Sequence, residues 1–221
     1  MIKVYGDISL ADIVAEKPDD WNITDATHVR VQLPSSANYG IKMQQDGFFF
    51  ADRTIKTSIN LSKCPLNLEK LIRLPIQETS HYKEDILRIA CASFVSDRRF
   101  HVALDYNAKI AELVLKAWVM ELDEVLVCFF KEIPVGFLAL KKTNADSLFV
   151  HLAAVEEKYR MTGAAMALYA KACMLASERG YKKLEGRISS QNLAVMNLYA
   201  AFGALFSEPQ DIFLKEVKYE A

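Results

Sequence analysis

The sequence predicts an α/β fold (an α+β mixed sheet), in which helices pack on a sheet of parallel and antiparallel strands. Three observations support it. Runs rich in Val, Leu, Cys and Phe alternate with segments whose apolar residues repeat at helical spacing. Two of the helical patterns end at a glycine, as helices commonly do. From residue 70 onward the predicted order is βααβββαβαβ, which is typical of packed α/β layers.

The first half of that order is assigned from apolar spacing. The run Leu71–Pro75 predicts a strand, and the segments Tyr82–Phe94 and Asn107–Leu122 predict amphipathic helices. Glu124–Phe130 and Val135–Leu140 predict two strands of a hairpin that turns at Lys131 and Glu132.

The second half contains the clearest helix, Thr162–Arg179, which Thr162 can cap and Gly180 can end. The remaining elements are the strand Ser147–Val155, the strand Lys183–Ile188, the helix Asn192–Phe202 before Gly203, and the strand Asp211–Val217.

Composition narrows the class of protein. The chain has 221 residues, 52% of them hydrophobic and 25% charged, which is ordinary for a globular protein. The formal net charge of −1 argues against a general nucleic-acid binder. The four cysteines form no CxxC pair and no zinc spacing, so we expect core-filling thiols and no metal. Because there is no apolar signal core and no window of about 18 apolar residues, we expect a cytoplasmic protein that does not bind membranes.

The chain divides into two segments of different character. Residues 1–69 hold short, turn-rich elements, and residues 70–221 hold the clear alternation of helices and strands. Ser-Ser-x-Asn occurs at 35–38 and again at 189–192, each time between a strand and a helix that leads to a glycine and a further strand. This echo is either chance or the trace of a duplicated fold whose first copy, residues 1–69, is incomplete.

The segment 155–165 has the features of an anion site. A strand leads into a turn at Gly163, and the following helix begins with N–H groups that have no intrahelical partner. Those donors and the positive end of the helix dipole attract phosphate. Arg160 adds a positive charge, and the small residues let a ligand approach the backbone. A plain strand-to-helix turn is the alternative.

A second motif follows about thirty residues later. Tyr199 lies inside an otherwise apolar helix, and Asn192 stands at its start. Tyr199 is either a core aromatic or a functional phenol, and Asn192 is either an N-cap alone or also a ligand contact.

These two motifs resemble those of the GNAT superfamily of N-acetyltransferases. Arg160-x-x-Gly163-x-Ala165 is similar to the acetyl-CoA signature (Q/R)xxGx(G/A), and residues 192–203 are similar to NxxxxxLYxxxGF. Ala204 departs from the pattern, since Phe usually follows the last glycine. The loop at 96–100 and the layout of two halves also resemble the sugar-nucleotide N-acetyltransferases of the dTDP-fucosamine type, in which a degenerate GNAT-like half precedes the catalytic one.

The resemblance implies a direct transfer of acetyl from acetyl-CoA to a primary amine in a ternary complex. The pantetheine arm would lie along the strand, and the pyrophosphate would bind to backbone N–H groups of the turn. The residues implied in cofactor binding are Leu152, Ala153, Ala154, Val155, Arg160, Met161, Thr162, Gly163, Ala164, Ala165, Asn192 and Tyr199. Tyr199 matches the general acid that protonates the leaving thiolate. The first half lacks these features and should not bind acetyl-CoA.

The base and the acceptor are less determined. His151 precedes the cofactor turn and is a candidate base, since imidazole titrates near neutrality. The alternatives are that its ring is only satisfied by neighbouring groups on the strand, and that water removes the proton. Arg98, Arg99, Phe100 and His101 suit a nucleotide diphosphate, unless they form a solvated loop.

We therefore expect an N-acetyltransferase that acts on a nucleotide-linked amino sugar. The protein could form a homodimer. The alternatives are a protein or small-molecule amine as acceptor, or a non-catalytic acyl-CoA-binding protein. An acidic acceptor cleft would favour a peptide or polyamine, and a basic one a nucleotide-linked sugar.

Overall fold

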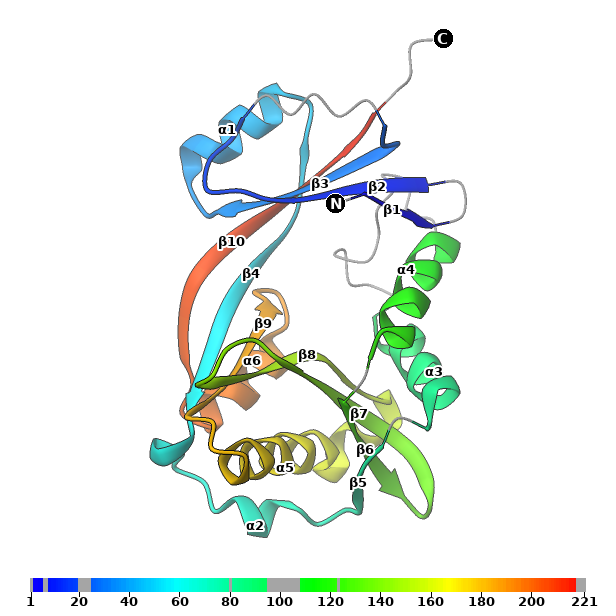
Figure 1. The fold of residues 1–221 in the computed structure, drawn as a ribbon, viewed down its shortest axis with the longest axis vertical. Helices are drawn as coiled ribbons and strands as arrows, with labels where there is room; N and C mark the ends of the chain where they lie inside the picture. Colours follow the sequence, from blue (N-terminus) through cyan, green and yellow to red (C-terminus); the bar gives the residue numbers. More distant parts are fainter. Residues whose placement is uncertain are drawn as a thin grey trace.

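The computed structural model describes residues 2–5, 8–19, 25–79, 81–94, 108–122 and 124–217, with the backbone alone for residues 108–111. The described residues form one ten-stranded sheet with helices packed against it (Figure 1). The predicted α/β fold with a mixed sheet is confirmed.

The strands are β1 Ile2–Tyr5, β2 Ile8–Val14, β3 His28–Pro34, β4 Phe49–Asn60, β5 Ile76–Glu78, β6 Glu124–Phe130, β7 Ile133–Lys142, β8 Ser147–Val155, β9 Lys183–Ser189 and β10 Leu205–Glu216. The α-helices are α1 Ala37–Gln45, α2 Leu68–Leu71, α3 Lys83–Ser93, α4 Ala108–Met120, α5 Ala164–Glu178 and α6 Leu193–Ala201. Short 3-10 turns are η1 Leu61–Lys63 and η2 Glu157–Thr162. None of the helices in these ranges is long and apolar enough to cross a membrane.

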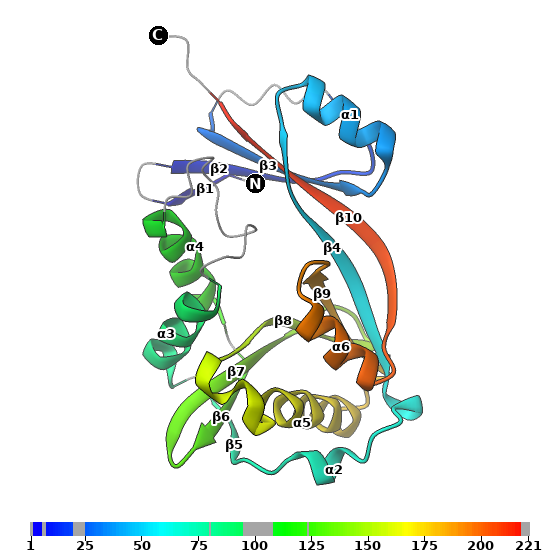
Figure 2. The same ribbon diagram turned by 180° about the vertical axis from the view of Figure 1, so that it is seen from behind.

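Helices cover both faces of the half of the sheet formed by β5 to β9. The core on one face includes Leu168 of α5 and Tyr199 of α6, and the core on the other includes Ile89 of α3 and Val114 of α4. Figures 1 and 2 show this arrangement from opposite sides. Because both faces are covered, β6 is buried along almost its whole length, which explains its continuous apolar run.

Strands of the two sequence segments alternate in the middle of the sheet. The order is β1-β2-β3-β10-β4-β9-β8-β7-β6-β5. The C-terminal strand β10 lies between β3 and β4, and β4 in turn lies between β10 and β9. The last strand of each segment thus lies between two strands of the other segment, so both segments share one sheet.

The directions of the strands are the same on the two sides of the β10–β4 pair. On one side β3 is antiparallel to β10 and parallel to β2, and β2 is in turn antiparallel to β1. On the other side β9 is antiparallel to β4 and parallel to β8, and β8 is in turn antiparallel to β7. This correspondence agrees with the two Ser-Ser-x-Asn segments, which follow β3 and β9. A degenerate repeat with its boundary at residue 69 stays a prediction.

The β2–β3 pair differs from the β8–β9 pair in one respect that matters for ligands. β2 pairs with β3 as far as Val14 opposite Gln32, and the N–H of Ala15 continues the ladder to the carbonyl of Gln32, 3.0 Å away. Within the part of the chain that the structure describes, the ladder between β2 and β3 is unbroken to the end of β2 and leaves no unpaired edge there for a strand-like ligand.

Two expectations about elements are wrong. The strand predicted at Leu71–Pro75 is the end of α2 followed by an irregular segment, and the strand begins at Ile76. Asn67 caps α2 by accepting from the N–H of Lys70 at 3.3 Å, and Pro75 has no N–H to donate to a ladder. The other helices and strands predicted from residue 82 to residue 202 agree to within two residues at each end.

The last strand is longer than predicted. It begins at Leu205 and not at Asp211, because it pairs with β4 along nearly its whole length. Residues 205–209 are mostly exposed and carry little apolar pattern, so this pairing is invisible in the local sequence.

Replacing Asp211 by Asn is expected to destabilise the fold where the two segments meet. The buried carboxylate of Asp211 accepts from Arg53 Nε at 2.6 Å and from Ser35 Oγ at 3.1 Å. Because Arg53 is about half exposed and stays solvated, we expect a loss of about 1–2 kcal/mol in the free energy of unfolding. Urea titration measures it. The exposed pair Lys182–Asp146 is the control, and its Asp146→Asn variant should show no measurable change.

Candidate functional site

The strands β8 and β9 separate part-way along their length. They pair in parallel from Ser147 opposite Lys183 to Val150 opposite Gly186. Beyond this point β8 pairs with β7, and β9 pairs with β4. On its β9 side the backbone of residues 152–155 therefore has no partner strand, and an extended ligand can add there as a strand does.

A β-bulge lies in β8 where the strands separate. Leu140 pairs with Val150 and Ala139 pairs with Leu152, so His151 is the extra residue. The imidazole of His151 stacks on Trp118 of α4, with ring centroids 5.2 Å apart and an interplanar angle of 21°. Leu152 joins the core on the same face of the sheet. The bulge thus turns two consecutive side chains toward α4.

The environment of His151 favours the neutral form of its ring. Burial lowers the pKa of His151 below its ordinary value of 6.5, and the charge of Lys141 lowers it further. Glu121 opposes this shift, and Lys3 adds to it. A neutral imidazole in a β-bulge can accept a proton from an amine placed beside it.

Tyr199 lies at the point where β8 and β9 separate. Its ring is wholly buried and packs edge to face on Tyr169, with centroids 5.1 Å apart. No hydrogen bond of normal geometry reaches its hydroxyl among the described residues, although the hydroxyls of Tyr169 and Thr57 lie close to it. Burial raises the pKa of Tyr199, so the phenol keeps its proton. A buried, protonated and unpartnered hydroxyl is an uncommon feature that a ligand atom could satisfy.

The sequence analysis missed Gly186, which lies directly against Tyr199. A Cβ added to Gly186 would lie 2.3 Å from the hydroxyl oxygen of Tyr199 and 3.2 Å from Oγ1 of Thr57. Glycine is therefore what allows the phenol to lie over the last paired residue of β9. The available signal was a glycine inside a strand, which often marks a close approach.

The predicted anion site has the expected backbone. Gly163 has a φ of +84°, and the first bond within α5 runs from the N–H of Ala167 to its carbonyl. The N–H groups that begin the helix are those of Ala164, Ala165 and Met166, which the helix itself does not use. Gly163, and not Thr162, is the N-cap residue, so that part of the prediction is wrong. Thr162 belongs to η2, and its hydroxyl donates to the carbonyl of Tyr159 at 2.6 Å.

Arg160 and Met161 lie on the exposed side of this turn. Arg160 donates from Nε to the carbonyl of Val155 at 3.3 Å, and Met161 is 97% exposed. Asn192 is an N-cap: its Oδ1 accepts from the N–H of Val195 at 3.1 Å.

One cavity of about 90 Å³ joins several of the predicted residues; we call it the splay cavity. Its lining includes His151, Leu152, Ala153, Asn192 and Tyr199. Ala154, Val155 and the turn from Arg160 to Ala165 are not part of that lining. Arg98, Arg99, Phe100 and His101, predicted to bind the acceptor, lie outside the described residues.

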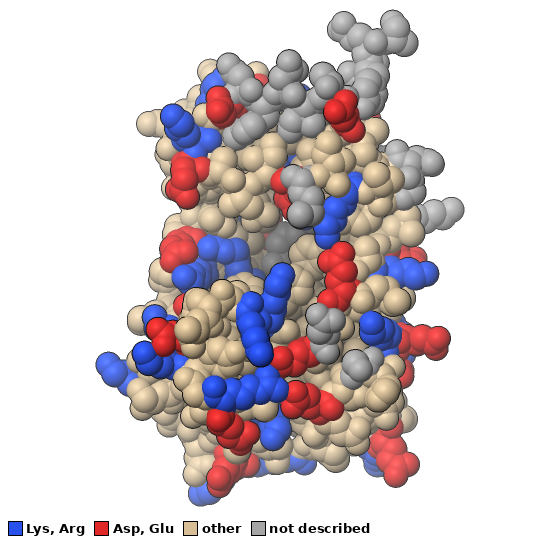
Figure 3. Space-filling model, in the orientation of Figure 1, with Lys and Arg blue, Asp and Glu red and all other residues tan. Residues whose placement is uncertain are grey.

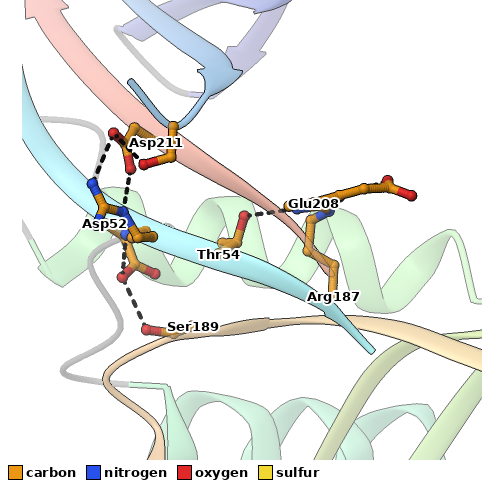
Figure 4. Close-up of polar contacts among 8 residues, drawn as sticks. Asp52, Thr54, Arg187, Ser189, Glu208 and Asp211 are labelled. Atoms are coloured by element: carbon orange, nitrogen blue, oxygen red, sulfur yellow. Dashed lines mark hydrogen bonds and ion pairs between the residues drawn. The ribbon is translucent and has the colours of Figure 1, made fainter. Parts of the chain in front are cut away.

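Polar contacts hold the free end of β9 to β4 and β10 (Figure 4). Ser189 Oγ donates to Asp52 Oδ1 at 2.9 Å, and the guanidinium of Arg187 donates to the carbonyl of Glu208 at 2.9 Å and to Thr54 Oγ1 at 3.4 Å. These bonds draw β9 toward β4, away from β8, where the two strands separate.

The pKa of His151 sets an expected pH dependence. If this imidazole is the base, kcat/KM should rise with an apparent pKa below 6.5, because burial and Lys141 favour the neutral ring. The Lys141→Gln variant should move that rise to higher pH, since a neighbouring positive charge is removed. The His151→Gln variant should lose it. A rise that is identical in all three proteins would exclude His151 as the base.

A family model agrees with this geometry. Residues 84–204, more than half of the chain, match the model described as Acetyltransferase (GNAT) family. No curated protein sequence matches the chain.

Solved structures show the same fold at low sequence identity. A functionally unknown conserved protein from Staphylococcus epidermidis is similar with a TM-score of 0.66 and 18% identity over 87% of this chain and 74% of its own. A GCN5-related N-acetyltransferase from Sphaerobacter thermophilus has a TM-score of 0.57 and 17% identity, covering 86% and 60%. A GNAT-family acetyltransferase from Colwellia psychrerythraea has a TM-score of 0.56 and 13% identity, covering 87% and 66%.

The chain thus spans 60% to 74% of the length of these structures. The separated strands β8 and β9, the bulge at His151 and the turn at Gly163 all lie within the matched residues 84–204. The chain belongs to the GNAT family of acetyltransferases.

Proposed function

We propose that this protein transfers an acetyl group from acetyl-CoA to a primary amine by direct attack in a ternary complex. The buried, unpartnered hydroxyl of Tyr199 at the separation of β8 and β9 carries this proposal. Acetyl-CoA supplies an activated acyl group on a thiol leaving group. Three features suit it: the unpaired edge of residues 152–155, the turn at Gly163, and this phenol.

The roles of the residues follow from their positions. The N–H groups of Ala164, Ala165 and Met166 would bind phosphate at the start of α5, and the exposed Arg160 adds charge there. The edge of β8 would align the pantetheine arm. Tyr199 would give its proton to the sulfur as the thiol leaves, and His151 would take one from the attacking amine. Holding amine and thioester in line supplies much of the rate.

For the acceptor we propose the amine of a nucleotide-linked amino sugar. Arg98, Arg99, Phe100 and His101 support this choice through their chemistry, because guanidinium groups bind phosphate and an aromatic ring stacks on a base. A protein amine or another small amine is the competing acceptor.

The glycine turn gives a test of acetyl-CoA binding with a closely matched control. Gly163 and Gly180 have φ values of +84° and +81°, and no atom lies within 4 Å of a Cβ added to either. Because alanine disfavours a positive φ, each Gly→Ala change should cost about 1–2 kcal/mol of stability through backbone strain and not through a clash. Only Gly163→Ala places a methyl group where a phosphate would lie. It should raise the KM for acetyl-CoA about tenfold, and Gly180→Ala should not.

Two measurements on the unmodified protein complete the test. Saturating acetyl-CoA should raise the melting temperature, because the ligand binds the folded state. Thiol release on addition of an amine would then demonstrate transfer. An acetyl-CoA shift without transfer to any amine would indicate a non-catalytic acyl-CoA-binding protein, and no shift would refute the assignment of the site.

A further inference from the structure

A larger pocket of about 590 Å³ adjoins the splay cavity; we call it the large pocket. His151 and Trp118 line both. Its volume is within the range of clefts that hold small-molecule ligands. A ligand in the large pocket can therefore touch the imidazole of His151, which also lines the splay cavity together with Tyr199.

The first three strands form the far wall of the large pocket. Lys3 and Tyr5 of β1, Asp12 of β2 and Arg30 of β3 contribute to its lining. Lys3 Nζ donates to Glu121 at 3.3 Å and ties β1 to the end of α4. The strands β1, β2 and β3 thus help to shape a site whose chemistry lies in the second segment.

Each acidic group that the structure describes in this lining has a cationic neighbour. Arg30 Nε donates to Asp12 Oδ1 at 3.0 Å, and Lys3 pairs with Glu121. Glu124 pairs with Arg179, which lies outside the lining. Among the described lining residues no carboxylate is without a cationic partner, so a polyamine would gain no ion pair with them unless it displaced one.

Two lining lysines remain without such neighbours. Lys141 and Lys142, at the end of β7, are exposed, and the described part of the chain gives neither of them an ion-pair partner. Figure 3 shows basic and acidic side chains intermingled on one face of the molecule, and the whole chain has a net charge of −1. Attraction for an anion must therefore come from local groups such as these.

We propose that the large pocket binds the acceptor, and that Lys141 and Lys142 select a primary amine that also carries an anionic group. This rests on the proposed acetyl transfer and narrows its substrate class. The amine would point to His151 and the anion to the lysines. Lys141 and His151 line the same pocket, and Lys141 pairs with Phe149, two residues from His151 on β8.

The test compares amines of one scaffold: glucosamine, phosphorylated glucosamine and glucosaminic acid, with spermidine as the cationic alternative. Thiol release is measured at about pH 8, where His151 is neutral in every variant. We expect kcat/KM about tenfold higher for an anionic amine than for glucosamine. The Lys141→Gln/Lys142→Gln double variant should abolish that preference. Lys116→Gln, an exposed lysine of α4 outside both linings, should retain it.

Each outcome bears on the proposal. A preference for phosphate or for carboxylate identifies the anion, and either supports it. A preference for spermidine or glucosamine, or an equal loss for all amines in the double variant, overturns it. If acetyl-CoA binds but no amine is acetylated, the proposed transfer fails separately. Calorimetry with phosphorylated glucosamine then decides the pocket: binding that the double variant loses supports the proposal, and no binding refutes it.

Discussion

Tyr199→Phe is expected to lower kcat by about a hundredfold or more, as loss of a general acid does. The change removes only the hydroxyl, which is buried and without a partner in the described structure. The edge-to-face contact of its ring with Tyr169 remains. The KM for acetyl-CoA should therefore change little. Single-turnover thiol release separates the chemical step from binding.

The stability of the same variant distinguishes catalysis from structure. Removing this hydroxyl breaks no hydrogen bond of normal geometry, and the neighbouring Thr57 Oγ1 is already without one, so the free energy of unfolding should stay within about 1 kcal/mol of the original value. The raised pKa of Tyr199 keeps the phenol protonated at neutral pH, so the loss of kcat should be the same from pH 6 to 8, roughly the range in which histidine titrates. A stable Tyr199→Phe protein with full kcat would show that Tyr199 is a core aromatic only.

The local parts of the site could be predicted from the sequence. Gly163 and the helix after it carry their own signals, because a left-handed turn and small first-turn residues are short-range features. Asn192 is an N-cap for the same reason. The roles of Tyr199 and His151 came from a resemblance and from position, and the structure adds that both line one cavity.

The non-local parts could not be predicted. The pairing of β10 with β3 and β4 joins residues more than 140 positions apart, and nothing in a local window records such a partner. The bulge at His151 depends on register with β7. Lys3 and Arg30 contribute to the large pocket only because strands of the two segments alternate in one sheet. Likewise, Gly186 gains its meaning from a tyrosine on a later helix.

Gly186→Ala is expected to disturb both the fold and the chemistry. The new Cβ would lie 2.3 Å from the hydroxyl oxygen of Tyr199, closer than any real contact, so the phenol or β9 must shift. The ring of Tyr199 is wholly buried against Tyr169 and cannot move freely. Overpacking of this kind typically costs about 1–3 kcal/mol. Because the displaced hydroxyl is also the proposed acid, kcat should fall by about a hundredfold.

A double-mutant cycle separates the clash from other effects of the methyl group. In the Tyr199→Phe background the oxygen at 2.3 Å is gone, and the remaining neighbours, Thr57 Oγ1 at 3.2 Å and the ring Cζ at 3.3 Å, need only a small adjustment. Most of the stability cost of Gly186→Ala should therefore disappear, giving a coupling of about 1–2 kcal/mol between the two positions. Gly40→Ala is the control, since nothing lies within 4 Å of its added Cβ and it should slightly stabilise α1. Additive costs in the cycle would mean that Gly186 does not position Tyr199, and that the alignment of the phenol with the separated strands rests on the packing of α6 alone.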